Sequence, residues 1–386
     1  MSLRRAIPLP CLALAACVLA CAGPPRQAAR LPDAALLSGA TLFGEELRPG
    51  ALPQSDVLAL DAEMRAFVAA KTGNASHAES RMRRLLRGMA DEGLLTLDYD
   101  LAATRSARQT FRTRSGNCLS FTILFVALAR EAGLDAGFQL LDIPPVWTGG
   151  TGTVWRSNHI TAVVRNVRKS ANGRRSYTVD FNNTQFSGNH TARQVSDGYA
   201  IALYHSNLAA EALAQRKRRN AFAHLRQAVQ SHPNVPGAWI NLGVLYARGG
   251  ALHMAEACYL RALASAPKER SAMLNLASLY ERQGRGELAE YYQRQVRFHQ
   301  RRNPYYHYWL AERALGEARV EDSLRAIRRA IRLQEDEHLF HSLAGVIHQR
   351  AGDSEAAQAS FQKAAAHAGN EKLRRRYNRK RAALER

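Results

Sequence analysis

The apolar positions of the chain change their spacing from one region to the next. Between Cys118 and Arg130 they leave almost no polar face, which predicts a buried helix that ends before Gly133. Elsewhere, short runs of apolar residues, or of alternating apolar and polar residues, predict strands. Longer runs with helical spacing predict two helices upstream. The expected strands lie at 139–143, 158–164 and 177–182, and the upstream helices at 56–70 and 77–93.

A second pattern recurs every 34 residues from about 203 to 370. One phase holds Leu208, Leu242, Leu276, Leu310 and Ala344, and another holds Ala221, Ala255, Ala289, Ser323 and Ala357. Gly250, Gly284 and Gly352 share a phase that suits a turn, which Arg216 and Ala318 break. This period is typical of tetratricopeptide repeats and predicts five helix pairs over 203–370. We expect large residues to fill gaps between neighbouring units: Trp239, Tyr259, Tyr280 and Phe361. The basic segment 371–386 is expected to form a capping helix.

The N-terminal segment predicts export. Arg4 and Arg5 precede the apolar stretch 6–20, which is too short and too rich in proline to span a membrane. Cys17 and Cys21 each end a stretch that looks like a bacterial lipoprotein box. We favour a signal peptide over 1–20, lipidation of Cys21 and a linker over 21–55, with Cys17 or a plain signal peptide as alternatives. No Asp follows either cysteine, which favours the outer membrane, facing the periplasm.

Candidate chemistry begins at Cys118. A thiolate is the nucleophilic form of cysteine, and a helix start stabilises it through unpaired N–H groups and the helix dipole. Gly116 supplies a turn just before it. His159 on a later strand is the expected base, and Asp180 on the next is expected to orient the imidazole. His190 and Asp142 compete for these roles, but they lack this order and local pattern.

These residues resemble the transglutaminase-like superfamily, which shares papain-type chemistry. Gly116-Asn117-Cys118 opens a helix, and His159 and Asp180 follow in the family's order, so the resemblance covers about 57–200. It implies an α+β, papain-like domain with a Cys-His-Asp triad that acts on amides. Animal members carry Gln-Cys-Trp at the nucleophile, where this chain has Asn117-Cys118-Leu119, and no acidic loop suggests calcium regulation. We therefore expect this domain, with its helical lead-in, over 56–202, followed by an all-α tetratricopeptide-repeat solenoid over 203–370.

The segment 144–155 lies between two expected strands, just before His159. Its glycines favour mobility, and Trp147 and Trp155 are candidates to flank an extended substrate over Cys118. The alternative is that both tryptophans pack inward. We expect the backbone N–H of Cys118 to form part of an oxyanion site.

Composition adds limits on partners. The net charge of +21 suits an acidic partner or an anionic envelope surface, and export argues against nucleic acid. The basic residues are dispersed, as on solvated helix faces. Cys258 is the other cysteine of the folded part and is expected to be a core residue. Neither a metal-ligand spacing nor a phosphate-binding glycine loop is present, so we expect no metal and no cofactor.

Together these features predict an exported, lipid-anchored cysteine enzyme. Cys118 would attack a peptide or glutamine-type amide, and water rather than an amine would resolve the thioester. The repeat groove would bind the protein or peptide substrate, or dock a partner. One alternative is a non-catalytic envelope scaffold that binds peptides through the repeats. Another is an enzyme that acts on peptidoglycan peptides.

Overall fold

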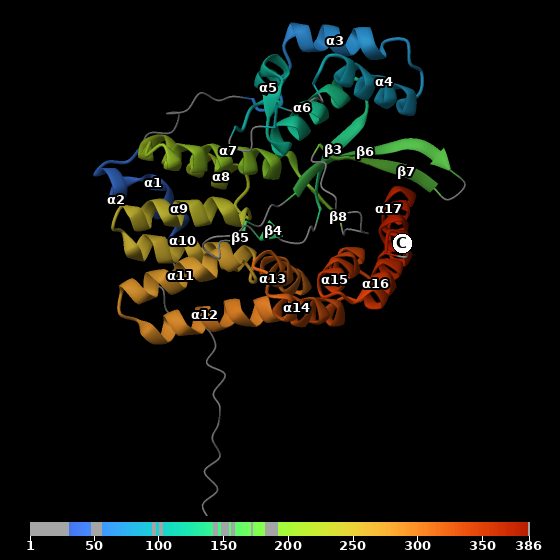
Figure 1. The fold of residues 1–386 in the computed structure, drawn as a ribbon. Coiled ribbons are helices and arrows are strands. Elements are labelled where there is room, and N and C mark those ends of the chain that lie inside the picture. The colour runs from blue at the N-terminus through green and yellow to red at the C-terminus, as the bar shows by residue number, and fades with distance from the viewer. Residues whose placement is uncertain are drawn as a thin grey trace, which may run out of the picture.

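The computed structural model describes residues 31–47, 56–94, 98–99, 103–141, 146–147, 154–155, 159–170, 173–181 and 192–384. Figure 1 shows a unit of helices and strands that continues into a curved stack of helices. The predicted fold class, an α+β region followed by an all-α array, is confirmed. The signal region with Cys17 and Cys21 lies outside the described residues.

Four helices belong to the same unit as the main sheet and precede it in the chain: α3 (Ala62–Thr72), α4 (Ala78–Asp91), α5 (Ala107–Thr113) and α6 (Cys118–Glu131). Helix α3 begins later than the apolar pattern indicated because the Asp61 carboxylate caps it, accepting from the N–H of Met64 at 3.1 Å. Helix α6 starts at Cys118 as predicted, and its residues 119–129 are all buried. A helix without a polar face needs cover on every side, so α6 forms the centre of this domain.

The main sheet contains four described strands in the order β7-β6-β3-β8, all antiparallel. Their bounds are β3 (Asp135–Leu141), β6 (His159–Ser170), β7 (Gly173–Val179) and β8 (Ala192–Val195). Helix α6 packs on β3 and β6. Two short pairs accompany the sheet: β1 (Asp98–Tyr99) beside β2 (Ser115–Gly116), and β4 (Val146–Trp147) beside β5 (Val154–Trp155).

Residues 192–384 are described without a break, and within them ten helices form the five predicted pairs. The pairs are α7 (Asp197–Ala214) with α8 (Arg218–Ser231), α9 (Pro236–Arg248) with α10 (Leu252–Ser265), α11 (Arg270–Arg282) with α12 (Gly286–Arg301), α13 (Pro304–Gly316) with α14 (Val320–Leu333), and α15 (His338–Arg350) with α16 (Ser354–Ala366). Helix α17 (Glu371–Ala382) covers α16 and buries Tyr377, so it caps the stack.

Small residues allow the two helices of a pair to approach closely. A Cβ at Gly243 would lie 2.4 Å from the ring of Tyr259, and one at Gly345 would lie 2.8 Å from the ring of Phe361. Both aromatic rings thus fill space inside their own unit, which the sequence did not predict, because each replaces the missing side chain of the first helix. The predicted contacts between units are seen for Tyr280, whose hydroxyl donates to Glu256 of the preceding pair at 2.7 Å.

Part of the predicted linker is folded. Residues 33–38 and 40–43 form α1 (Asp33–Ser38) and α2 (Ala40–Phe43). Leu36 is fully buried, its carbonyl accepts from the hydroxyl of Tyr246 at 2.8 Å, and the ring of Phe43 packs edge-on against Phe222. These contacts hold α1 and α2 on the first two repeats. The linker prediction was wrong here because these apolar contacts are distant in sequence. Among the described helices, none is both long and apolar enough to cross a bilayer.

Candidate active site

The start of α6 holds Cys118 in a fixed position. The side chain of Asn117 caps the helix by accepting from the N–H of Ser120 at 3.0 Å. Before it, Gly116 leaves no room for a side chain, because a Cβ there would lie 2.7 Å from Cβ of Ser120. The Cys118 side chain is half-buried, so it remains accessible. The predicted turn at Gly116 and the cap formed by Asn117 thus place this thiol at the positive end of the helix dipole.

The cap leaves the first two backbone donors of α6 unpaired. Asn117 satisfies the third N–H of the helix, that of Ser120. Within the described part of the chain, the N–H groups of Cys118 and Leu119 have no acceptor. Unpaired N–H groups at a helix start attract an anion, so the Cys118 N–H is suited to an oxyanion site.

His159 is the first residue of β6 and pairs in register with Leu141 of β3. Its side chain is completely buried, and Nε2 lies 2.7 Å from Oδ1 of Asp180. The other ring nitrogen, Nδ1, is buried and makes no hydrogen bond among the described residues. The strand is joined to α6 near this point, where the hydroxyl of Thr122 donates to the carbonyl of Ile160 at 3.4 Å. The buried Nδ1 is therefore the nitrogen left to receive a proton from the thiol.

Opposing effects act on the imidazole. Burial disfavours its charged form and lowers the pKa of His159, whereas the hydrogen bond with Asp180 and the neighbouring Cys118 thiol raise it. The stabilising interactions prevail, and the pKa rises to about 9. The ring is then protonated at neutral pH, which favours a partner that carries a negative charge.

Asp180 directly follows β7, and its side chain is 31% exposed. The next residue, Phe181, is buried and packs against Phe121 and Phe125 of α6, with ring centroids 6.3 and 5.7 Å apart. These ring contacts anchor the end of β7 to α6 and bring Asp180 to His159. The structure thus brings together the three residues that the sequence singled out.

The structure describes the other candidate residues only in part. Trp147 and Trp155 end the short strands β4 and β5, in which Trp147 pairs with Val154 and Trp155 with Val146; their side chains lie outside the described structure. His190 and Asp142 also lie outside it. Cys258 is fully buried on α10, and burial raises the pKa of its thiol. The described residues contain no group of three or more His, Cys, Asp or Glu that could hold a metal ion.

Sequence reasoning missed the residues that support the cap. The hydroxyl of Thr104 accepts from Nδ2 of Asn117 at 2.8 Å, and the hydroxyl of Ser120 accepts from the N–H of Arg105 at 2.9 Å. Thr104 and Ser120 are buried. Ser120 stands three residues after the cap, a position that local pattern could have indicated. Nothing in the sequence near Thr104 points to a residue 13 positions away.

Comparison with known families agrees with the two-part architecture. Residues 65–166 match the family model of the transglutaminase-like superfamily, and residues 206–257 and 253–307 match that of the tetratricopeptide repeat. The chain thus contains a transglutaminase-like core domain and tetratricopeptide repeats. Cys118 and His159 fall inside the first match, and Asp180 lies beyond its end.

Solved repeat proteins resemble the second part only distantly. YrrB, described as a TPR protein with an unusual peptide-binding site, is 16% identical, with 46% of this chain and 92% of that one covered and a TM-score of 0.24. MamA of Desulfovibrio magneticus RS-1 is 20% identical, with 44% and 94% covered and a TM-score of 0.25. TTC0263, a TPR protein of Thermus thermophilus, is 19% identical, with 47% and 98% covered and a TM-score of 0.25. These likenesses carry no argument about function. No curated protein matches the chain.

Proposed function

We propose that the chain is a cysteine-dependent amide hydrolase or acyltransferase that acts on a protein or peptide selected by its repeats. One observation carries the proposal: the buried imidazole of His159 is bonded to Asp180 through one nitrogen, while the Cys118 thiol raises its pKa. A structural histidine in a sheet would satisfy both nitrogens, yet Nδ1 of this ring is buried without a partner among the described residues.

The reaction follows from these positions. In the resting pair the thiol proton of Cys118 is already held by His159, so Sγ attacks the carbonyl carbon of an amide as a thiolate. The carbonyl oxygen becomes an oxyanion that the Cys118 N–H stabilises. As the C–N bond breaks, the imidazolium returns its proton to the leaving amine, and a thioester remains. Water then attacks the thioester, loses a proton to His159 and releases the acid, while the thiol is regenerated.

Water is the favoured acceptor because it is abundant and the described residues form no evident site for a second amine. An amine acceptor would make the same thioester a route to transfer. A peptidoglycan peptide offers the same amide bond as a protein substrate. If labelling shows Cys118 to be an ordinary thiol, the alternative of a non-catalytic peptide-binding scaffold replaces the enzyme.

The repeats supply a means of selecting the substrate. Asn207, Asn241 and Asn275 are spaced 34 residues apart on the first helices of three successive pairs, and all are half-buried. Nδ2 of Asn241 already donates to the carbonyl and hydroxyl of Ser206, at 3.4 and 3.3 Å, which leaves its Oδ1 to accept from the backbone N–H of an extended peptide. Figure 1 shows β4 and β5, which precede His159 in the chain, on the side of the sheet that faces the helical stack. This arrangement supports delivery of a bound segment to Cys118.

We also propose export, with lipidation of Cys21 or Cys17 and an outer-membrane position facing the periplasm. The support is the charged and apolar pattern of residues 1–21. Fractionating cells that carry Cys17→Ser or Cys21→Ser tests it, because loss of the anchor releases the protein from the membrane fraction.

The test of catalysis is the pH dependence of Cys118 alkylation by iodoacetamide, followed by mass spectrometry of the peptide that contains Cys118. We expect fast labelling already at about pH 6 because a thiolate–imidazolium pair forms there. In the His159→Ala variant, labelling should be lost at pH 6 and should appear only near pH 8.5, the ordinary range of a thiol. Cys258 serves as an internal control, since it is buried and should remain unlabelled in the folded protein. Equal profiles for the wild type and His159→Ala would refute the proposed triad.

A further inference from the structure

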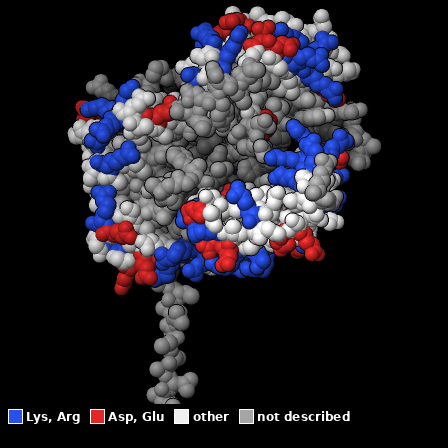
Figure 2. All heavy atoms as spheres, in the orientation of Figure 1, with Lys and Arg blue, Asp and Glu red and all other residues white. Residues whose placement is uncertain are grey.

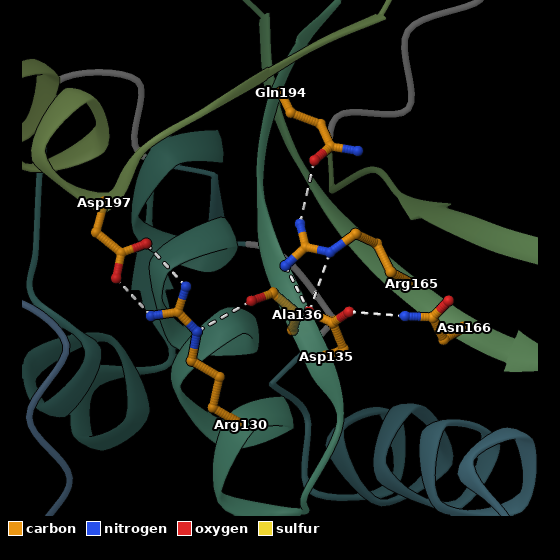
Figure 3. A network of polar contacts seen from close by, with 7 residues as sticks. All are labelled: Arg130, Asp135, Ala136, Arg165, Asn166, Gln194 and Asp197. Carbon is orange, nitrogen blue, oxygen red and sulfur yellow. Dashed lines mark hydrogen bonds and ion pairs between the residues drawn. The ribbon is translucent and has the colours of Figure 1, made fainter.

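The first repeat helix is tied to both ends of the helix that carries Cys118. At the end of α6, the guanidinium of Arg130 donates to both carboxylate oxygens of Asp197, at 2.6 and 2.8 Å, and Asp197 begins α7. Figure 3 shows this fork and the third bond of Arg130, from Nε to the carbonyl of Ala136 at 3.0 Å. Near the start of α6, a second set of hydrogen bonds leads to Glu211, which lies close to the C-terminal end of α7. The two helices therefore run antiparallel, and each end of α6 is bonded to the repeat array.

The second tie is a chain of hydrogen bonds that leads to the nucleophile's cap. The carboxylate of Glu211 accepts from the backbone N–H of Thr104 at 2.9 Å. The hydroxyl of Thr104 accepts from Nδ2 of Asn117 at 2.8 Å. Oδ1 of Asn117 then accepts from the N–H and the hydroxyl of Ser120, both at 3.0 Å. Every link but Glu211 is buried, so a broken link would leave a polar group unsatisfied.

This series of hydrogen bonds fixes the orientation of the Asn117 side-chain amide. An asparagine amide can present either its oxygen or its nitrogen to a neighbour, and only the oxygen can cap a helix. Because the hydroxyl of Thr104 accepts from Nδ2 of Asn117, Oδ1 of Asn117 faces the N–H of Ser120. The backbone beside Thr104 is bonded to the start of α6, through the carbonyl of Ala103 and the N–H of Arg105, and Glu211 binds the N–H of Thr104 itself from the repeat array.

We propose that Glu211 is a positioning residue for Cys118, so that the repeat array completes the site. The proposal rests on the proposed function, in which the start of α6 holds the reactive thiol. Within the described part of the chain, no Lys, Arg or His forms an ion pair with Glu211, and the one hydrogen bond of its carboxylate is accepted from the N–H of Thr104. Its role at this position is therefore to accept that bond, rather than to balance a charge.

The test compares Glu211→Ala with Glu211→Gln by the pH midpoint of Cys118 alkylation and by thermal unfolding. The cap stabilises negative charge at the helix start, so Glu211→Ala should move the midpoint up by about half a pH unit to one unit. Glu211→Gln should keep the wild-type midpoint, because its amide oxygen still accepts from Thr104. Thr104→Val removes the hydroxyl that accepts from Asn117 and keeps the shape of the side chain, so it should shift the midpoint as Glu211→Ala does. This variant replaces Glu211→Ala in the test if Glu211→Ala fails to fold.

Two controls separate positioning from general loosening. Asp197→Asn breaks the tie at the far end of α6 and should lower the melting temperature while leaving the midpoint unchanged. Glu290→Ala removes an exposed carboxylate on α12 and should change neither. The inference is overturned if Glu211→Ala and Thr104→Val label as the wild type does, if Glu211→Gln shifts as far as Glu211→Ala, or if Asp197→Asn shifts the midpoint equally. Failure of the proposed function is seen separately, as a His159→Ala profile equal to that of the wild type.

Discussion

At the scale of residues, the site depends on a charge that burial opposes. His159 is completely buried, and a buried imidazole would ordinarily stay neutral. The carboxylate of Asp180 remains partly exposed to water and lies 2.7 Å from Nε2. The protonated ring is thus stabilised from one side by an anion that stays partly solvated, and from the other by the thiol. Positive charge at His159 makes the site suited to holding a thiolate.

This charge predicts a loss of stability in alkali. The pKa of His159 is about 9 in the folded chain and 6.5 in an ordinary histidine, so the folded state binds the proton more tightly. The stabilisation is full below pH 6.5 and is lost as the pH rises to 9, by about 3 kcal/mol in all. Urea unfolding between pH 6.5 and 9.5 measures it. Asp180→Asn should flatten this dependence, and an equally steep decline in that variant would contradict the assignment.

At the scale of elements, the turns of the repeats share one backbone conformation. Gly250, Gly284 and Gly352 have φ of +82°, +71° and +78° in the turn between paired helices. Arg216 and Ala318, which break the glycine phase, nevertheless adopt φ of +59° at the same place. The geometry of the pair thus imposes the left-handed conformation on residues that do not favour it.

Because the turn requires a left-handed conformation whether or not glycine is present, substitutions at two equivalent turn positions should change the stability of the repeats in opposite directions. Ala318→Gly should stabilise the repeats by about 1 kcal/mol, because glycine adopts φ of +59° without a Cβ clash. Gly284→Ala should destabilise them by about the same amount, since no heavy atom lies within 4 Å of its added Cβ and only the backbone conformation changes in cost. Urea unfolding followed by circular dichroism measures both. Changes of the same sign would show that the turn conformation does not control stability here.

At the scale of the whole molecule, the sequence predicted the two-part architecture and failed where distant segments meet. Cys118, His159 and Asp180 stood out because their local patterns are strong and follow a known order. The contact of Thr104 with Asn117 and the packing of Leu36 under Tyr246 join segments 13 and 210 residues apart, and no local pattern records them. Local periodicity determines which elements form, whereas the partners of a polar side chain depend on the completed fold.

The charge of the whole molecule leads to a last prediction. Figure 2 shows Lys and Arg side chains gathered over α17, and Lys372, Arg375 and Arg379 line a pocket of about 470 Å³ there together with Glu371. The positions 372, 375 and 379 recur on one face of a helix, so their charges add on one side. We expect the protein to sediment with vesicles that contain phosphatidylglycerol, and less so as salt is raised.

A matched pair of triple variants decides whether this face or the net charge is responsible. Changing Lys372, Arg375 and Arg379 to Gln removes three charges from α17, and changing Arg325, Arg328 and Arg329 to Gln removes three exposed charges from α14. If α17 contacts the anionic surface, the first variant should lose most of the vesicle binding and the second should retain it. Equal losses would mean that the net charge of +21 acts as a whole, without a preferred face. If only the α17 variant loses binding, a lipid anchor near residue 21 and the basic face of α17 have separate roles, since only the contact made by α17 weakens with salt.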